Sequence, residues 1–347
     1  MIHSLFISTN GFRRFFCLAV LPAVILLLGA FSVKAQDDEP IVTETSLVQL
    51  NIGVVDSQGR AITTLSRNNF TLYEDGVKQT IQSFSPTDAP FSLVVLLDVS
   101  GSTINFRAQM KQAAIRFLDA LAPEDRVAVI AFNTRVKLLA AFTTDRPKTA
   151  YAISIAEGAG GGETHLFDAL KQGLNALRLE GKQRRKAIVL LTDGLDTQMR
   201  NSDRTLLSRA QTDQEALALL KPEPGQAVNE ILNESARQGV TIFPLALPSG
   251  DPKRLPLPDP VITGIYTAAR TRLQALADRT GGRINEIQRL DQLARIYVEV
   301  AANLRTLYTV AYQAPGQHAR DGKWHEIRIE VTPTELIART RPGYFAR

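Results

Sequence analysis

Residues 92–102 read SLVVLLDVSGS, a short apolar run that passes directly into an Asp-x-Ser-x-Ser sequence. The apolar run is typical of a strand that is buried on both faces of a parallel sheet. In open α/β sheets, ligands bind beyond the carboxyl ends of the strands, which is where Asp98, Ser100 and Ser102 would lie. By itself this polar sequence is equally typical of an ordinary turn, because Asp, Ser and Gly are common turn residues.

Similar apolar runs recur through the middle of the chain, and segments with apolar residues every three or four positions separate them. The runs are typical of buried parallel strands, and the segments between them are typical of amphipathic helices. Strand alternating with helix predicts an α/β fold, a doubly wound and mostly parallel sheet, over residues 90–305. The expected strands are 92–97, 127–132, 187–191, 240–247 and 283–287, and the expected helices are 106–121, 166–177, 266–280 and 290–305.

Both ends of the chain have a different pattern, in which apolar and polar residues alternate. Strands with this period of two form antiparallel sheets with one face in water. Either end alone has too few strands to be stable. Residues 41–88 and 306–347 are therefore expected to form one small β-sandwich around the inserted α/β domain. The alternating segments are 46–55, 308–312 and 327–331. Segments 70–73 and 77–84 flank a hairpin turn at Asp75-Gly76, and a second turn lies at Asp321-Gly322.

The first 35 residues have the three parts of a secretory signal peptide. An arginine pair at positions 13 and 14 precedes a long apolar run, and the small residues that end at Ala35 suit a signal peptidase. A retained membrane anchor is the alternative, because the apolar run is at the short end of spanning length. We expect cleavage after residue 35, a secreted or periplasmic protein, and no stable membrane span in the mature chain.

The overall composition is that of an ordinary globular protein, with 44% hydrophobic and 22% charged residues. The lone cysteine, Cys17, excludes a disulfide scaffold and lies within the signal segment. That segment carries three basic residues and no acidic one, so its removal lowers the net charge from +5 to +2. A nearly neutral chain gives no electrostatic reason to expect a nucleic-acid partner. The charge run at residues 182–186 is expected to be a solvated loop.

Two further segments bring polar oxygen atoms to the same edge of the predicted sheet. A glycine-rich loop ends in Glu163-Thr164 just before an expected helix, and the strand 187–191 runs into Thr192-Asp193-Gly194. Together the three loops offer two carboxylates and three hydroxyls, and no histidine or cysteine belongs to the set. Hard oxygen ligands of this kind are typical of Mg²⁺ or Mn²⁺ and not of zinc. The set is Asp98, Ser100, Ser102, Thr164 and Asp193.

This set resembles the metal-ion-dependent adhesion site of von Willebrand factor type A (VWA) domains. The Asp-x-Ser-x-Ser, Thr and Asp elements of that family occur here in the same order, and the resemblance covers residues 90–305. It implies that Ser100, Ser102 and Thr164 bind the metal directly. It also implies that Asp98 and Asp193 act mainly through water. The expected ion is Mg²⁺, with Mn²⁺ and Ca²⁺ as alternatives. The β-rich ends further resemble those of secreted bacterial proteins that carry this domain.

The resemblance implies a binding or adhesion module that recognises a carboxylate on a protein or another envelope partner. Neutral hydroxyl ligands would leave the cation able to attract such a group. The alternative is a metal-dependent, phosphatase-like hydrolase with Asp98 as its nucleophile. Such an enzyme would need a second carboxylate two residues later, where this chain has Ser100. The sequence also contains no P-loop, no nucleophile elbow and no zinc-protease helix motif. We therefore expect that the protein is not an enzyme.

Two excursions follow strands at the edge that carries the metal set. Residues 197–238 include an added helical segment, and residues 248–266 contain five prolines that favour extended chain. We expect both to form walls beside the cation and to select the partner, and the alternative is surface decoration. Glu163 is expected to point into solvent. Asp196 is expected to be a turn residue, and His165 a capping or surface residue.

Overall fold

The computed structural model describes residues 47–346, except for 158–161, 182–183, 221–224, 250, 255, 258 and 319–320. The expected signal peptide and the alternative of a retained anchor therefore lie outside the described residues. Within the described part, no helix is both long enough and apolar enough to cross a membrane.

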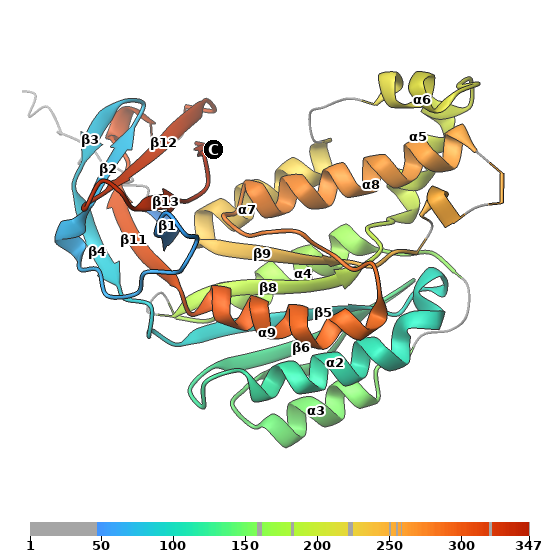
Figure 1. Cartoon of the computed structure of the whole chain (residues 1–347), viewed down its shortest axis with the longest axis horizontal. Helices are drawn as coiled ribbons and strands as arrows, with labels where there is room; N and C mark the ends of the chain where they lie inside the picture. Colours follow the sequence, from blue (N-terminus) through green and yellow to red (C-terminus); the bar gives the residue numbers. More distant parts are fainter. Residues whose placement is uncertain are drawn as a thin grey trace, which may run out of the picture. The chain divides into compact units, whose positions relative to one another are not determined.

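A six-stranded sheet lies in the middle of the described chain (Figure 1). Its strands are β5 (Phe91–Asp98), β6 (Arg126–Phe132), β7 (Val136–Thr143), β8 (Arg185–Thr192), β9 (Val240–Ala246) and β10 (Asn285–Glu286). They are ordered β10-β9-β8-β5-β6-β7, and all neighbours are parallel except β7, which pairs with β6 in the antiparallel direction. This arrangement confirms the predicted doubly wound, mostly parallel sheet.

Helices cover both faces of this sheet, because the sheet is apolar on both sides. The helices are α2 (Arg107–Asp119), α3 (Arg146–Ser154), α4 (Leu166–Arg178), α7 (Gln226–Gln238), α8 (Pro260–Asp278) and α9 (Leu293–Leu304). On one face, Leu93, Val95 and Leu97 of β5 share a core with α2, α3 and α9. On the other face, Val94 and Leu96 share a core with α4, α7 and α8. Two cores on opposite faces explain why the strand sequence is apolar without a break.

Two four-stranded sheets form the β-sandwich. Their strands are β1 (Leu47–Val55), β2 (Phe70–Glu74), β3 (Val77–Gln79), β4 (Ile81–Ser85), β11 (Leu307–Gln313), β12 (Trp324–Val331), β13 (Ile337–Arg339) and β14 (Gly343–Phe345). The orders are β13-β1-β11-β4 and β14-β12-β2-β3, so each sheet contains strands from both ends of the chain. Leu50, Leu72, Tyr308 and Tyr312 are fully buried in the core between the sheets. The predicted sandwich of N- and C-terminal strands is confirmed.

Some elements differ from the prediction. The strand expected at 77–84 is interrupted at Thr80, because β3 pairs with β2 in one sheet and β4 pairs with β11 in the other. Residues 77–84 contain no Gly, Pro, Asn or Asp that would mark a turn, so the local sequence did not reveal this crossing. The strand β7 and the helix α3 were not predicted. Of the β7 residues only Ala140 is buried, so this edge strand leaves little periodic signal.

The described part of the first excursion contains α5 (Thr197–Leu207), α6 (Asp213–Leu219) and the helix α7, which covers the central sheet. Leu207 and Ala216 pack with Ile265 of α8 in a small core, so the excursion is folded against α8. The helix α8 begins at Pro260 and not at 266, because Asp259 accepts the N–H of Ile262 at 3.0 Å and caps the helix. Short 3₁₀ turns are η1 (Arg67–Asn69), η2 (Gly101–Phe106), η3 (Pro252–Arg254), η4 (Leu290–Gln292) and η5 (Gly316–His318).

The charge run at residues 182–186 is not a solvated loop where the structure describes it. Arg185 is the first residue of β8 and is buried. Its guanidinium donates to the carbonyls of Thr87 at 2.6 Å, Ala89 at 2.8 Å and Leu307 at 2.6 Å. These acceptors belong to the two segments that connect the sandwich to the α/β domain, so Arg185 ties both connections to the central sheet. The acceptors are distant in sequence, which is why the prediction was wrong.

Candidate metal centre

Asp98 ends β5 at the carboxyl edge of the central sheet and is fully buried. Its Oδ1 accepts the backbone N–H of Ser100 at 3.0 Å, and its Oδ2 accepts the hydroxyl of Thr192 at 2.6 Å. The hydroxyl oxygens of Ser100 and Ser102 lie 3.1 Å apart at the start of η2. The Asp98 carboxylate therefore fixes the turn that carries both serine hydroxyls.

Asp193 directly follows β8, and β8 is the parallel neighbour of β5, so the register places Asp193 near Asp98. Its Oδ1 accepts the N–H of Leu195 at 3.0 Å across Gly194, whose φ of +83° is a left-handed conformation that favours glycine. Arg270 of α8 donates to the backbone carbonyl of Asp193 at 2.5 Å. Within the described residues, Asp193 Oδ2 is buried and makes no hydrogen bond.

Two carboxylates are thus buried near each other at the sheet edge. Burial and the nearby charge of Asp193 raise the pKa of Asp98 to about 7. Burial also raises the pKa of Asp193, although the hydroxyls of Ser102 and Ser249 favour its charged form. Both pKa shifts arise mainly from burial, and a divalent cation would offset the cost of burying the two negative charges. The free oxygen of Asp193 and the neighbouring hydroxyls therefore fit a hard cation.

Thr164 is buried on the next loop, two residues before α4. Its N–H donates to the Thr197 hydroxyl at 2.7 Å, and its carbonyl accepts the N–H of Thr197 at 3.0 Å. Asp196, which was expected to be a turn residue, caps α5 and also accepts the N–H of Leu166 at 3.0 Å. These bonds fasten the Thr164 loop to the segment that follows Asp193.

The structure brings four residues of the predicted set together, namely Asp98, Ser100, Ser102 and Asp193. The fifth residue, Thr164, lies on the adjoining loop. Among the residues that the structure describes, no hydrogen bond joins its side chain to the other four. The role of Thr164 as a ligand therefore stays a prediction, and the same holds for the division into direct and water-mediated ligands.

A cleft of about 320 Å³ opens beside Thr164, between the beginnings of α4 and α5. Its lining includes Glu163, His165 and Asp168. His165 lies 3.3 Å from the Glu163 carboxylate and 3.2 Å from the Asp168 carboxylate, and both acidic side chains are exposed. Polar groups next to the metal set thus surround a space that a side chain of another molecule can enter.

Three residues that the sequence did not single out complete the surroundings of the metal set. Thr192 donates to Asp98, as described above, and Ser249 donates to the backbone carbonyl of Ser102 at 2.7 Å. Arg270 holds the Asp193 backbone. Thr192 had a visible signal, because it occupies the end of the same strand as the predicted ligand. Ser249 and Arg270 come from distant segments with no motif of their own.

Residues 93–195 match the family of von Willebrand factor type A domains. The matched range contains all five residues of the predicted metal set and the strands from β5 to β8. This part of the chain therefore matches the VWA domain family, which confirms the resemblance inferred from the motifs. The family match and the carboxylate and hydroxyl side chains at the sheet edge together support a metal-dependent, adhesion-type module.

The chain is also similar to individual proteins. An uncharacterized protein from Synechocystis sp. is 33% identical over 118 residues, which are 34% of this chain and 28% of that protein. The chain thus spans well under half of this relative. A solved von Willebrand factor type A structure from Catenulispora acidiphila is 14% identical with a TM-score of 0.47, and the match covers 81% of this chain and 74% of that chain. The corresponding domain of the type V pili tip protein Mfa5 from Porphyromonas gingivalis is 15% identical with a TM-score of 0.46, covering 62% and 95%.

Proposed function

We propose that this protein binds a carboxylate of an envelope partner through a divalent cation at the edge of its central sheet. Mg²⁺ is the expected ion. Ser100, Ser102 and Thr164 hold the cation with their hydroxyls. Asp98 and Asp193 orient these ligands and the coordinated water. Neutral hydroxyl ligands do not cancel the positive charge of the bound cation, so the cation still attracts the carboxylate of the partner. The observation that carries the proposal is Asp193 Oδ2, which is buried near a second carboxylate and makes no hydrogen bond in the described chain.

The surrounding bonds support a site that is already arranged before a ligand arrives. Arg270 donates to the backbone carbonyls of Asp193 and Leu247, and its Nε lies 3.2 Å from the Glu286 carboxylate. One side chain therefore joins the ends of β8, β9 and β10. Because the ligand-bearing turns are held by such bonds, little of the binding free energy is lost to ordering them.

The partner approaches from the carboxyl edge of the sheet. The cleft beside Thr164 accepts part of the partner next to the cation. Ser249 of the second excursion touches the Ser102 backbone, which supports a role of that excursion as a wall of the site. Ile104, two residues after Ser102 in η2, is 52% exposed and offers apolar contact to the partner.

We also propose that the protein acts outside the cytoplasm, secreted or in the periplasm. The features of the first 35 residues support this location, and so does the absence of cysteine from the rest of the sequence. A partner on the cell envelope is then within reach of the metal site.

Partner binding is expected to depend on the cation and on Ser100. Immobilised protein incubated with envelope extract in Mg²⁺ should retain a partner that a chelator releases, and Ser100→Ala should retain at least tenfold less. Ser83→Ala, which alters an exposed serine of the sandwich, serves as the matched control and should bind like the wild type. Amidation of the carboxylates in the extract should abolish capture. Capture that survives both chelation and amidation contradicts the proposal.

We further propose that the metal centre binds a partner and catalyses no reaction. A panel of phosphoesters with Mg²⁺ is the test, because a phosphatase-like hydrolase is the alternative reading of Asp98. Robust hydrolysis that Asp98→Asn abolishes would replace the binding module by an enzyme. We expect no hydrolysis above that of the Asp98→Asn variant.

A further inference from the structure

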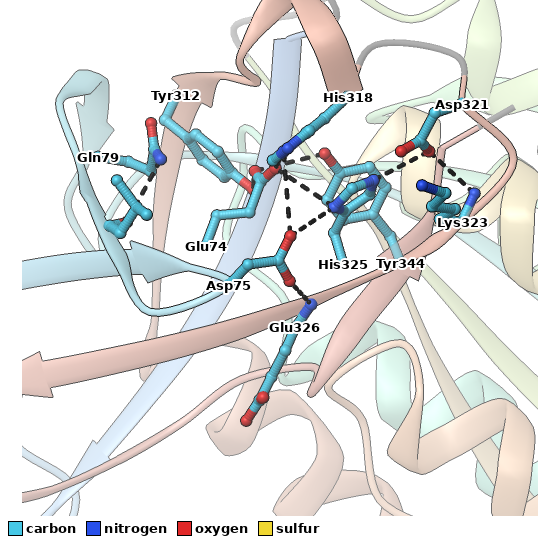
Figure 2. Close-up of polar contacts among 11 residues, drawn as sticks. Glu74, Asp75, Gln79, Tyr312, His318, Asp321, Lys323, His325, Glu326 and Tyr344 are labelled. Carbon is cyan, nitrogen blue, oxygen red and sulfur yellow. Dashed lines mark hydrogen bonds and ion pairs between the residues drawn. The ribbon is translucent and has the colours of Figure 1, made fainter.

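A second group of metal-type side chains lies in the β-sandwich, outside the residues that match the VWA family (Figure 2). Glu74 ends β2, Asp75 follows it in the turn to β3, His318 ends η5, and His325 lies in β12. One atom from each of the four side chains can be chosen so that all four lie within 4.8 Å of one another. Two imidazoles and two carboxylates therefore face a common point.

The distances between the histidine nitrogens and the carboxylate oxygens bracket the spacing of ligands around a tetrahedral ion. His318 Nδ1 lies 2.8 Å from Glu74 Oε1 and 3.9 Å from Asp75 Oδ2. His325 Nδ1 lies 2.7 Å from Asp75 Oδ2 and 3.8 Å from Glu74 Oε1. Ligands about 2.0 Å from a tetrahedral zinc ion are about 3.3 Å apart, between the shorter and longer pairs. The imidazole rings of His318 and His325 are stacked with centroids 4.3 Å apart, so they approach the common point side by side.

Neighbouring residues outside the group hold His325, Glu74 and Asp75 in place by hydrogen bonds. The second nitrogen of His325, Nε2, lies 3.0 Å from Asp321 Oδ1, the carboxylate-to-histidine contact that commonly backs a zinc ligand. Glu74 Oε2 accepts the Tyr312 hydroxyl, and the Tyr344 hydroxyl lies 3.4 Å away. These bonds leave Glu74 Oε1 facing the histidines, as Figure 2 shows.

Asp75 is held in a similar way. Its Oδ1 accepts the N–H of Glu326 at 2.8 Å, and its Oδ2 remains on the side of the histidines. Asp75 also has a φ of +50°, in the left-handed region that L-residues other than Asn and Asp rarely adopt. Glu74 and His325 are buried, whereas Asp75 and His318 are partly open to solvent, so an ion has a path into the group.

We propose that Glu74, Asp75, His318 and His325 form a zinc site that is separate from the VWA metal centre. Imidazole nitrogen with carboxylate oxygen suits Zn²⁺, whereas Mg²⁺ prefers oxygen ligands alone. Four protein ligands leave no open position, which is typical of a structural and not a catalytic zinc ion. Binding would join the β2–β3 turn to η5 and β12, and it would displace protons that otherwise bridge the histidines and carboxylates.

The test is a calorimetric titration of the chelator-stripped full chain with ZnCl₂ in saturating Mg²⁺, which occupies the VWA centre. We expect one equivalent of zinc to bind and to raise the thermal unfolding temperature. Affinity should fall at least 100-fold in His325→Ala and in Glu74→Gln. Asp321→Asn removes only an outer contact and should cost about 10- to 100-fold.

Two controls separate this site from others. His165→Ala removes a more exposed histidine that also lies beside two carboxylates, and Asp98→Ala disables the VWA centre; both should bind zinc as the wild type does. His318→Ala, at a partly exposed residue, replaces His325→Ala in the titration if the latter does not fold. Absence of zinc binding, or binding that His318→Ala leaves unchanged, would show that the group is only an ion-pair network and would overturn the proposal.

Discussion

Removal of residues 306–347 is expected to destroy the β-sandwich and to make the remaining chain aggregate or become sensitive to protease within residues 47–85. The deletion removes β11 and β13, which are both neighbours of β1, and it removes β12, the neighbour of β2. The inward face of β1, including Leu50 and Ile52, would then meet water. Each such side chain contributes about 1.5–3 kcal/mol when buried, and a domain has only about 5–15 kcal/mol in total.

The matched control is removal of residues 343–347 alone. That deletion takes away β14, an edge strand with a single neighbour, so it should weaken the sandwich and leave it folded. Limited proteolysis with identification of the cleavage sites compares the two truncated chains. A soluble and protease-resistant segment 47–85 in the longer deletion would show that the two ends fold independently.

Replacing Arg185 with methionine is expected to lower the free energy of unfolding by about 3–4 kcal/mol. The methionine keeps an apolar stem, but it removes the donors that serve the carbonyls of Thr87, Ala89 and Leu307. These carbonyls remain buried by the surrounding chain and lose their partner, which is the costly part of the change. Burial lowers the pKa of Arg185 to about 10, so the guanidinium is still charged at neutral pH.

Urea unfolding of Arg185→Met, Arg185→Lys and Arg60→Met measures this effect. Arg60 is exposed and pairs with Asp56 four residues away, so its replacement should change stability very little. Arg185→Lys keeps the charge but loses the fork that reaches several acceptors, and it should fall between the other two. If Arg185→Met unfolds at the same urea concentration as Arg60→Met, the connections to the sandwich do not depend on this side chain.

Much of the fold could be predicted because it follows from periodicity. Four apolar runs with helical segments between them defined the parallel sheet, and alternation at both ends defined the sandwich. The passage of the chain between sheets at Thr80 was not predicted, since no turn residue marks it in the local sequence. The buried state of Arg185 was also invisible, because a local sequence does not show acceptors contributed by Thr87 and Leu307.

The candidate sites show the same contrast between local and distant information. Asp98, Ser100 and Ser102 lie within five consecutive residues, and a strand end marks Asp193, so a motif could identify them. Ser249 and Arg270 enter the same surroundings only through folding. The zinc-type group was missed entirely. Asp75 was interpreted as a turn residue, and the two histidines, more than 240 residues away, were not singled out. Only the pairing of β2 with β12 brings them together.

The central claim is that the edge of the VWA sheet holds a divalent cation. Calorimetric titration with Mg²⁺ of the chelator-stripped wild type, beside Asp98→Ala and Ser83→Ala, tests it most directly, because Mg²⁺ discriminates against the histidine-rich group in the sandwich. The account predicts a single site in the wild type and in Ser83→Ala, and a loss of affinity of at least 100-fold in Asp98→Ala. Mg²⁺ binding that is unchanged in Asp98→Ala, or no binding to the wild type, would contradict it.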